Sequence, residues 1–128
     1  MIRQTVHTDR GPKAIGPYSQ AIIANGFVYT SGQTAWVPET GKAIEGGVPE
    51  QTRQVLVNIG EILRAAGTSL ENVVKTTVYL HDIADFQAMN AVYAEFFPNN
   101  PPARTTVGNL NLPMGFMVEI EAIAVLPS

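Results

Sequence analysis

Arg104 is the residue whose type and setting point most directly to chemistry. It follows a turn that contains Pro98, Pro101 and Pro102, and it opens the β-branched run 105–107. Proline fixes φ and restricts the residue before it, so the guanidinium leaves a stiff segment at the start of an expected strand. The guanidinium has a planar set of N–H donors. Held by a stiff backbone segment, these donors suit bidentate binding of a carboxylate or a phosphate.

Two carboxylates near the end of the chain are the next candidates. Glu119 and Glu121 alternate along an expected strand, so both face the same side, and Ile123 and Val125 continue that face. Acidic groups beside apolar residues are seldom buried without a cationic or hydrogen-bonding partner. One of them could therefore act as a general acid or base near Arg104, if the last two strands pair. The alternative is an edge strand with two solvated acids.

Three further polar residues each have two explanations. Asn90 lies on the apolar stripe of an expected helix, where an unpartnered amide costs about 1–3 kcal/mol; it either ties the helix to a loop or lines a cleft. Ser31 ends an expected strand before Gly32, so it either lines a cleft or makes a turn. Tyr18 follows the stiff turn 15–17, and its ring either caps a pocket or, as we expect, covers the edge of the core.

Composition argues against several other kinds of function. The chain of 128 residues has no Cys, and its two His residues, His7 and His81, have no metal-ligand spacing. Its net charge is −3, its pI is near 5.2, and its eight Lys and Arg residues are scattered. No apolar stretch approaches the roughly 20 residues that span a bilayer, and the N-terminus lacks the apolar region of a secretion signal. We expect a cytoplasmic protein with no metal, cofactor, nucleic-acid or membrane partner.

Strands are expected on both sides of the two helices. Asn25-Gly26 is a two-residue hairpin signal, because both residues tolerate positive φ. The Gly- and Pro-rich segment 34–47 is typical of a surface loop, with a short hairpin at 39–42. The apolar and β-branched runs expected to form strands are 19–24, 27–31, 73–80, 104–107 and 117–125.

Two long helices are expected between these strands. The first runs from about residue 49 to residue 66, where apolar residues recur every three or four positions and Gly67 ends the pattern. The second runs from about residue 83 to residue 97, with Asp82 or Asp85 as its N-cap. The order of elements predicts one α+β domain over residues 1–128, with a sheet of about six strands and both helices on one face.

The second face of this sheet predicts self-association. Segments 21–24 and 122–125 are apolar at every position, whereas a solvated face would alternate polar with apolar residues. An apolar face of that size is rarely left in water, so we expect it to pack on another copy of the chain. The alternative is a sheet that curls around its own side chains.

Several segments together resemble one family. In chain order they are Ala-Ile-Gly-Pro-Tyr-Ser-Gln at 14–20, Thr-Ser-Gly-Gln at 30–33, Gln-Thr-Arg-Gln at 51–54, Ala-Ala-Gly at 65–67, Val-Lys-Thr-Thr-Val-Tyr-Leu at 74–80, Pro-Ala-Arg-Thr at 102–105 and Glu-Ile-Glu-Ala-Ile-Ala-Val at 119–125. They cover nearly the whole chain in order. The chain therefore resembles the RidA family (also called YjgF/YER057c/UK114) of reactive-intermediate imine deaminases.

This resemblance implies a fold, an assembly and a reaction. The fold is chorismate-mutase-like, and the assembly is a homotrimer with active sites in clefts between subunits. The reaction is hydrolysis of the imine forms of 2-aminoacrylate or 2-aminocrotonate to 2-keto acids and ammonia, without a cofactor. The residues that the resemblance places in the pocket are Tyr18, Ser31, Asn90, Arg104, Thr106 and Glu119.

The resemblance also implies roles within that pocket. Arg104 would hold the substrate carboxylate, and Glu119 would place or activate the attacking water. Thr106 stands where many relatives have Cys, which excludes thiol chemistry at this position, although the Thr106 backbone N–H could still meet the carboxylate. The sequence does not fix the preferred imine side chain, or whether Glu119 is a base or only orients water.

The chemistry fits a chain with so few reactive groups. An imine is already electrophilic, so a carboxylate clamp and one positioned acid suffice, with proton transfer contributing about 10²–10⁴-fold. The main hypothesis is therefore a 2-iminobutanoate/2-iminopropanoate deaminase, a hydrolase acting on C=N bonds. The alternative is a non-catalytic module that binds a small carboxylate in the same cleft. Ribonuclease activity, attributed to some relatives, is disfavoured by the acidic charge balance.

Overall fold

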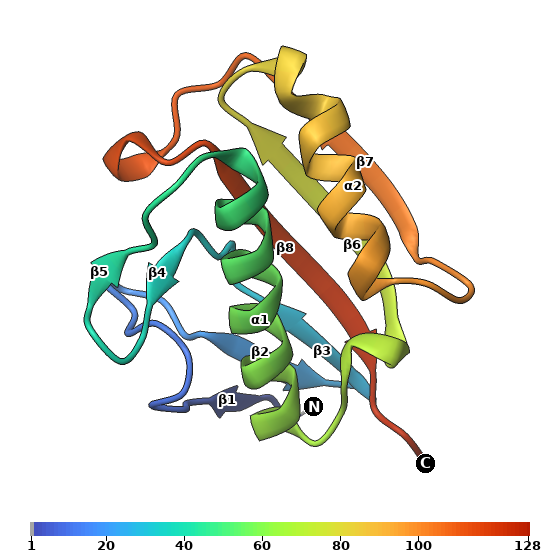
Figure 1. Cartoon of the computed structure of the whole chain (residues 1–128). Helices are drawn as coiled ribbons and strands as arrows, with labels where there is room; N and C mark the ends of the chain where they lie inside the picture. The colour runs from blue at the N-terminus through green and yellow to red at the C-terminus, as the bar shows by residue number, and fades with distance from the viewer. Residues whose placement is uncertain (1) are drawn as a thin grey trace.

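One mixed β-sheet with two helices on one face makes up the fold (Figure 1). The computed structural model describes residues 2–128, and the order of strands across its sheet is β1-β2-β3-β8-β6-β7. The strands are β1 (Gln4–Val6), β2 (Ala21–Ala24), β3 (Phe27–Thr30), β6 (Val73–Leu80), β7 (Ala103–Val107) and β8 (Val118–Val125). The helices are α1 (Val48–Ala66) and α2 (Phe86–Phe96). This arrangement confirms the predicted α+β class, the six strands and the two helices.

Turn-forming residues in the sequence explain most ends of the strands in the N-terminal half of the chain. Asn25 and Gly26 have φ of 52° and 81°, as a tight hairpin between β2 and β3 requires. Segment 34–47 contains the expected small hairpin, formed by β4 (Trp36–Val37) and β5 (Lys42–Ala43). β1 is a short strand that pairs with β2 and was not predicted.

Helix α1 packs its apolar stripe against the sheet. Leu56, Ile59 and Leu63 on this stripe are fully buried. Gly67 ends the helix in the left-handed conformation, with φ of 95°, and its N–H bonds to the carbonyls of Leu63 and Arg64. This confirms the predicted C-terminus. No helix within residues 2–128 is long and apolar enough to cross a membrane.

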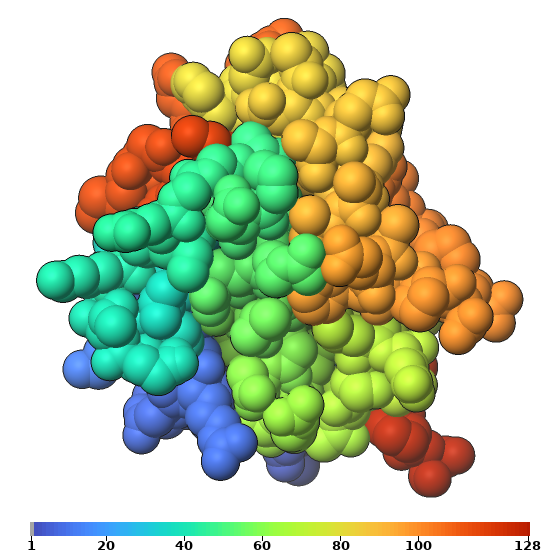
Figure 2. Space-filling model, in the orientation of Figure 1, coloured from blue at the N-terminus to red at the C-terminus, as the bar shows by residue number. Residues whose placement is uncertain are grey.

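Helix α2 is shorter than the predicted range 83–97. A 3-10 turn at Ile83–Asp85 precedes it, and the Asp82 carboxylate caps that turn by accepting a hydrogen bond from the Ala84 N–H at 2.9 Å. Phe97 has left the helical conformation because Pro98 follows it, and a residue before proline disfavours the α region. α1 and α2 lie side by side and, with the adjoining loops, cover the sheet (Figure 2).

The topology separates the last two strands. β6 and β7 pair in parallel through the α2 crossover, and β8 pairs with β6 and β3 on the other side. The crossover through α2 brings β7 to the side of β6 that β8 leaves free, where the two strands pair in parallel. β7 is therefore an edge strand of the sheet. β7 and β8 therefore do not pair, and the condition for placing Glu119 near Arg104 within one chain is not met.

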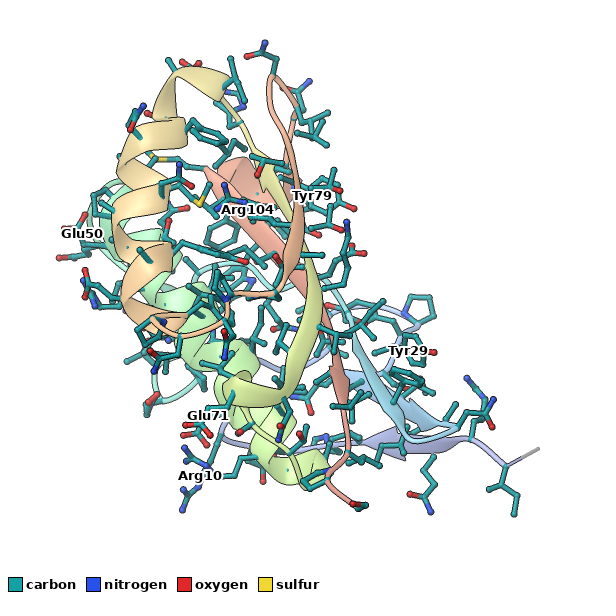
Figure 3. The ribbon with its side chains drawn as sticks, turned by 90° about the vertical axis from the view of Figure 1, so that its right-hand side faces the viewer. Arg10, Tyr29, Glu50, Glu71, Tyr79 and Arg104 are labelled. Atoms are coloured by element: carbon teal, nitrogen blue, oxygen red, sulfur yellow. The ribbon has the colours of Figure 1, made fainter. Side chains whose placement is uncertain are left out.

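The two faces of the sheet differ in burial. Along β8, Val118, Ile120, Ala122 and Ala124 are buried beneath the helices, and the residues between them are half-buried on the open face. Figure 3 shows Arg104 between the sheet and α2, whereas Tyr29 and Tyr79 point away from the helices. Of the aromatic residues on the open face, Phe27 is 37% exposed and Tyr29 is 43% exposed.

Candidate functional site

Three of the predicted site residues line one pocket on the open-face side of the sheet. Tyr18, Ser31 and Glu119 border a cavity of about 360 Å³, which we call the Glu119 pocket. Its other lining residues are Pro12, Lys13, Ile15, Gly32, Gln33, Thr34, Trp36 and Pro113. The pocket thus joins the N-terminal segment, the end of β3, the start of the β4–β5 hairpin and β8.

Side-chain to backbone hydrogen bonds fix the Tyr18 and Ser31 side of this pocket. The Ser31 Oγ donates to the Ser19 carbonyl at 2.6 Å, and the Tyr18 hydroxyl accepts from the Ile15 N–H at 3.2 Å. Tyr18 is 46% exposed, so it walls the pocket and does not cover the core, contrary to our expectation. The ring lies against its own turn, beside Gly16 and bonded to the Ile15 N–H, and this holds it at the pocket.

Gln20 holds the N-terminal segment against the pocket. Its buried side-chain amide donates to the carbonyls of Thr8 and Pro12 at 3.0 and 2.9 Å, and it accepts from the Thr8 N–H at 2.7 Å. A buried amide must satisfy both its donor and its acceptor groups, and these three bonds do so. Gln20 therefore positions the strip of chain that supplies Lys13 and Ile15 to the pocket.

The segment after β3 brings backbone directly against Glu119. Gln33 and Ile120 exchange backbone hydrogen bonds of 2.8 and 3.1 Å, which lays Gly32 beside β8. A Cβ built at Gly32 would overlap the Glu119 Oε2 and lie 3.0 Å from its Cδ. Only glycine leaves room for the carboxylate here.

Burial makes Glu119 a weaker acid than usual. Loss of hydration raises the pKa of Glu119, and the neighbouring Glu121 carboxylate raises it further. The Tyr79 hydroxyl donates to the Glu121 Oε1 at 3.1 Å. Burial is also the largest cause that raises the pKa of Tyr79, followed by its bond to Glu121. A raised pKa makes this carboxylate a stronger base than an ordinary glutamate, which suits it to accept a proton.

Arg104 lies in a second cluster, on the helix-covered face of β7. Its Cζ is 4.7 Å from the centroid of the Tyr93 ring and 5.4 Å from that of Phe86. Asn90 lies between Phe86 and Tyr93 on the same face of α2, at the i, i+4 and i+7 positions of the helix. Thr106 is two residues along β7 from Arg104, so its side chain points to the same face. We call these five residues the Arg104 cluster.

Within residues 2–128, the side-chain N–H groups of Arg104 and Asn90 are free to donate hydrogen bonds to a ligand. The ion pairs found within residues 2–128 join His7 to Asp9, Arg53 to Glu95 and Arg64 to Glu61, and none uses Arg104. The half-buried amide of Asn90 makes no side-chain hydrogen bond to another residue in this range, so of the two explanations considered for Asn90 the helix-to-loop tie is absent. An uncompensated guanidinium beside a free amide can bind a small carboxylate.

The sequence missed two aspects of this arrangement. Tyr93 and Phe86 are apolar-stripe residues of the second expected helix, and only the structure shows their rings against a cation. Gln20 was quoted only as part of a motif. The Gly and Pro residues near Gln20 in the sequence could have indicated its role. A segment without regular secondary structure needs side-chain partners for its backbone N–H and C=O groups. Within residues 2–128, no group of three or more His, Cys, Asp or Glu residues could hold a metal ion.

Comparison with known proteins identifies the family. Residues 8–126 match the family model described as endoribonuclease L-PSP. The chain is 47% identical to human 2-iminobutanoate/2-iminopropanoate deaminase, covering 98% of this chain and 91% of that protein. It is 49% identical to the chloroplastic Reactive Intermediate Deaminase A of Arabidopsis thaliana, covering 97% of this chain and 66% of that longer protein.

Solved structures agree with the sequence comparison. E. coli TdcF with bound serine has a TM-score of 0.92 and 40% sequence identity, covering 97% of this chain and 99% of that one. The family model spans residues 8–126 and these relatives match almost the whole chain, so the similarity in sequence and fold extends over nearly its full length. The chain belongs to the RidA/YjgF family, whose family model carries the description endoribonuclease L-PSP.

Proposed function

We propose that this protein is a deaminase that hydrolyses the C=N bond of small 2-imino acids, releasing 2-keto acids and ammonia. The observation that carries the proposal is the pair of complementary groups: an Arg104 guanidinium with no ion-pair partner among residues 2–128 and a Glu119 carboxylate of raised pKa beside a pocket. The human relative, 47% identical over 98% of this chain, bears the name 2-iminobutanoate/2-iminopropanoate deaminase.

The proposed reaction uses these two groups for different tasks. Arg104 binds the substrate carboxylate and fixes the position of C2. Glu119 orients a water molecule, takes one of its protons as the new C–O bond forms, and passes that proton to the imine nitrogen, which gives a carbinolamine. Glu119 then takes the hydroxyl proton of the carbinolamine and delivers it to the amino nitrogen as the C–N bond breaks. The keto group forms, ammonia leaves, and Glu119 is again a carboxylate.

The site proposed here is shared between copies of the chain. The Arg104 cluster lies under α2 on one face of the sheet, and Glu119 lies on the other face. We propose that a homotrimer forms by packing the β7 edge of one copy against the open face of the next, bringing Arg104, Asn90 and Thr106 of the first copy to Tyr18, Ser31 and Glu119 of the second. The exposed rings of Phe27 and Tyr29 and the partly exposed β8 residues support an interface there. A cytoplasmic location stays a prediction.

A coupled assay tests the activity. A threonine dehydratase generates 2-aminocrotonate, and semicarbazide traps the imine that remains while keto-acid release is followed. The wild type should accelerate keto-acid release and reduce trapping. Arg104→Ala and Arg104→Lys should both lose activity, because lysine cannot reproduce the planar fork. Binding of 2-oxobutanoate without any turnover would favour the alternative, a non-catalytic carboxylate-binding module.

A mixing experiment tests the shared site. Arg104→Ala and Glu119→Gln are each expected to be inactive alone. If each site takes Arg104 from one copy and Glu119 from another, a randomly reassembled equal mixture recovers about a quarter of wild-type sites. Recovery of activity supports the shared site, and light scattering should report a trimer. A mixture that exchanges subunits and stays inactive would contradict it.

A further inference from the structure

Tyr93 makes the closest aromatic contact to Arg104. The guanidinium carbon lies 4.7 Å from the Tyr93 ring centroid, inside the range of about 6 Å in which a cation is attracted to a ring face. Phe86 provides a second, more distant ring at 5.4 Å. Rings that contact the flat side of a guanidinium leave its N–H edge directed elsewhere, where a carboxylate can bind.

The Tyr93 ring is itself fixed by its surroundings. Tyr93 is 6% exposed, and its hydroxyl is 2.7 Å from the Oγ1 of Thr76, which is 1% exposed. Thr76 is the residue on β6 that pairs directly with Arg104 on β7. The ring also packs against Phe97, with 4.7 Å between centroids. A closed chain of contacts thus runs from the strand next to Arg104, through the ring, to the guanidinium.

Arg104 needs such a support because of its own flexibility. An arginine side chain carries about 2 kcal/mol of rotamer entropy, and β7 is an edge strand with only one neighbour. Burial raises the pKa of Tyr93, against smaller opposing effects of Thr76 and Arg104, so its phenol is neutral at pH 7. The contact is therefore between a cation and a neutral ring, and the guanidinium keeps its full charge for a ligand.

We infer that Tyr93 is a positioning residue for Arg104, holding the guanidinium by its ring in the orientation that binds the substrate carboxylate. The inference rests on the proposed function, because it assumes that Arg104 binds a carboxylate. It goes beyond that function by assigning the orientation of the clamp to a side chain that need not touch the substrate. The ring carries this role; its burial, the bond to Thr76 and the contact with Phe97 hold it jointly, so that the ring keeps its place when one of these supports is removed.

Three variants separate positioning from folding. Tyr93→Leu removes the ring, and Tyr93→Met, made in parallel, removes it but keeps most of the volume. Tyr93→Phe keeps the ring and loses only the hydroxyl. Phe97→Leu is the matched control, because it removes a neighbouring buried ring that makes no cation contact with Arg104 within residues 2–128.

The primary readout is calorimetric binding of 2-oxobutanoate, a product-like monocarboxylate that needs no turnover. We expect Tyr93→Leu and Tyr93→Met to weaken binding about tenfold, and Tyr93→Phe and Phe97→Leu to stay within about threefold of wild type. In the deaminase assay the same pattern should appear mainly in KM, because the carboxylate contact is made in both the ground and the transition state.

A double-mutant cycle gives the deciding result. Arg104→Lys should weaken 2-oxobutanoate binding in the wild-type protein. The factor by which it weakens binding should be about tenfold smaller when Tyr93 is already replaced by Met. Equal costs in both backgrounds, or equal losses in Tyr93→Met and Phe97→Leu, would overturn the inference. A wild type that binds 2-oxobutanoate but does not turn over imine would refute the proposed function alone, and the binding data would still decide the role of Tyr93.

Discussion

Replacing Gly32 with alanine is expected to disable the protein without unfolding it. A Cβ at this position would overlap the Glu119 Oε2 and lie 3.0 and 3.2 Å from its Cδ and Cγ, closer than ordinary van der Waals contact. All three of these atoms belong to a flexible side chain and none to the backbone. The carboxylate should therefore move away, and the strand should stay in place.

The size of the effect follows from the distance that Glu119 must move. Restoring ordinary contact displaces the carboxylate by about 1 Å or more, and a misplacement of that size costs about 10²-fold in rate. The folding cost is smaller, because an off-rotamer side chain costs about 0.5–1.5 kcal/mol. We therefore expect kcat to fall about 100-fold while the melting temperature changes by only a few degrees.

The assay measures kcat by keto-acid release and stability by thermal unfolding. Gly60→Ala is the matched control, because a Cβ there would lie 3.5 Å from Leu70, at ordinary contact distance, within α1. Alanine in a helix interior should stabilise the fold by about 0.5–1 kcal/mol and leave kcat unchanged. If Gly32→Ala folds and keeps a kcat within threefold of wild type, the position of Glu119 is not important for the reaction.

Two further variants test the pocket in other ways. Because folding raises the pKa of Glu119, this group favours the folded state at low pH, and that contribution is lost as pH rises through the raised pKa. Glu119→Gln should therefore be inactive yet melt higher than wild type at pH 7, an advantage that disappears at pH 4 in thermal unfolding; an equal advantage at both pH values would contradict the assignment. Gln20→Leu leaves the part-buried Thr8 N–H and carbonyl and the buried Pro12 carbonyl without their partner, and should cost about 1–3 kcal/mol in urea unfolding. An unchanged urea midpoint would show that Gln20 does not hold the N-terminal segment.

Local signals allowed most of the fold to be predicted. The Asn25-Gly26 turn, the three- and four-residue spacing in α1 and the stop at Gly67 each depend on neighbouring residues only, and the structure confirms all three. The alternation that placed Glu119 and Glu121 on one face of the last strand is also confirmed. β1 was missed because three residues with one buried side chain are too few to show alternation.

Non-local features could not be predicted in the same way. The insertion of β8 between β3 and β6 depends on the crossover of α2, and no local pattern encodes which strands become neighbours. The contact between Tyr93 and Arg104 likewise joins residues of different elements, so a tyrosine on an apolar stripe was interpreted as core. Tyr18 was wrongly assigned to the core edge because sequence cannot show which way a stiff turn points.

Arg104 and Glu119 lie on opposite faces of one sheet. If both belong to one active site, as we propose, a lone protomer carries two half-sites and no whole one. In the proposed trimer, the amount of active enzyme then follows mass action and not simply the amount of protein. At protein concentrations below the dissociation constant for assembly, total activity should fall more steeply than in proportion to the protein concentration. Serial dilution would therefore read the strength of the interface directly from the loss of specific activity.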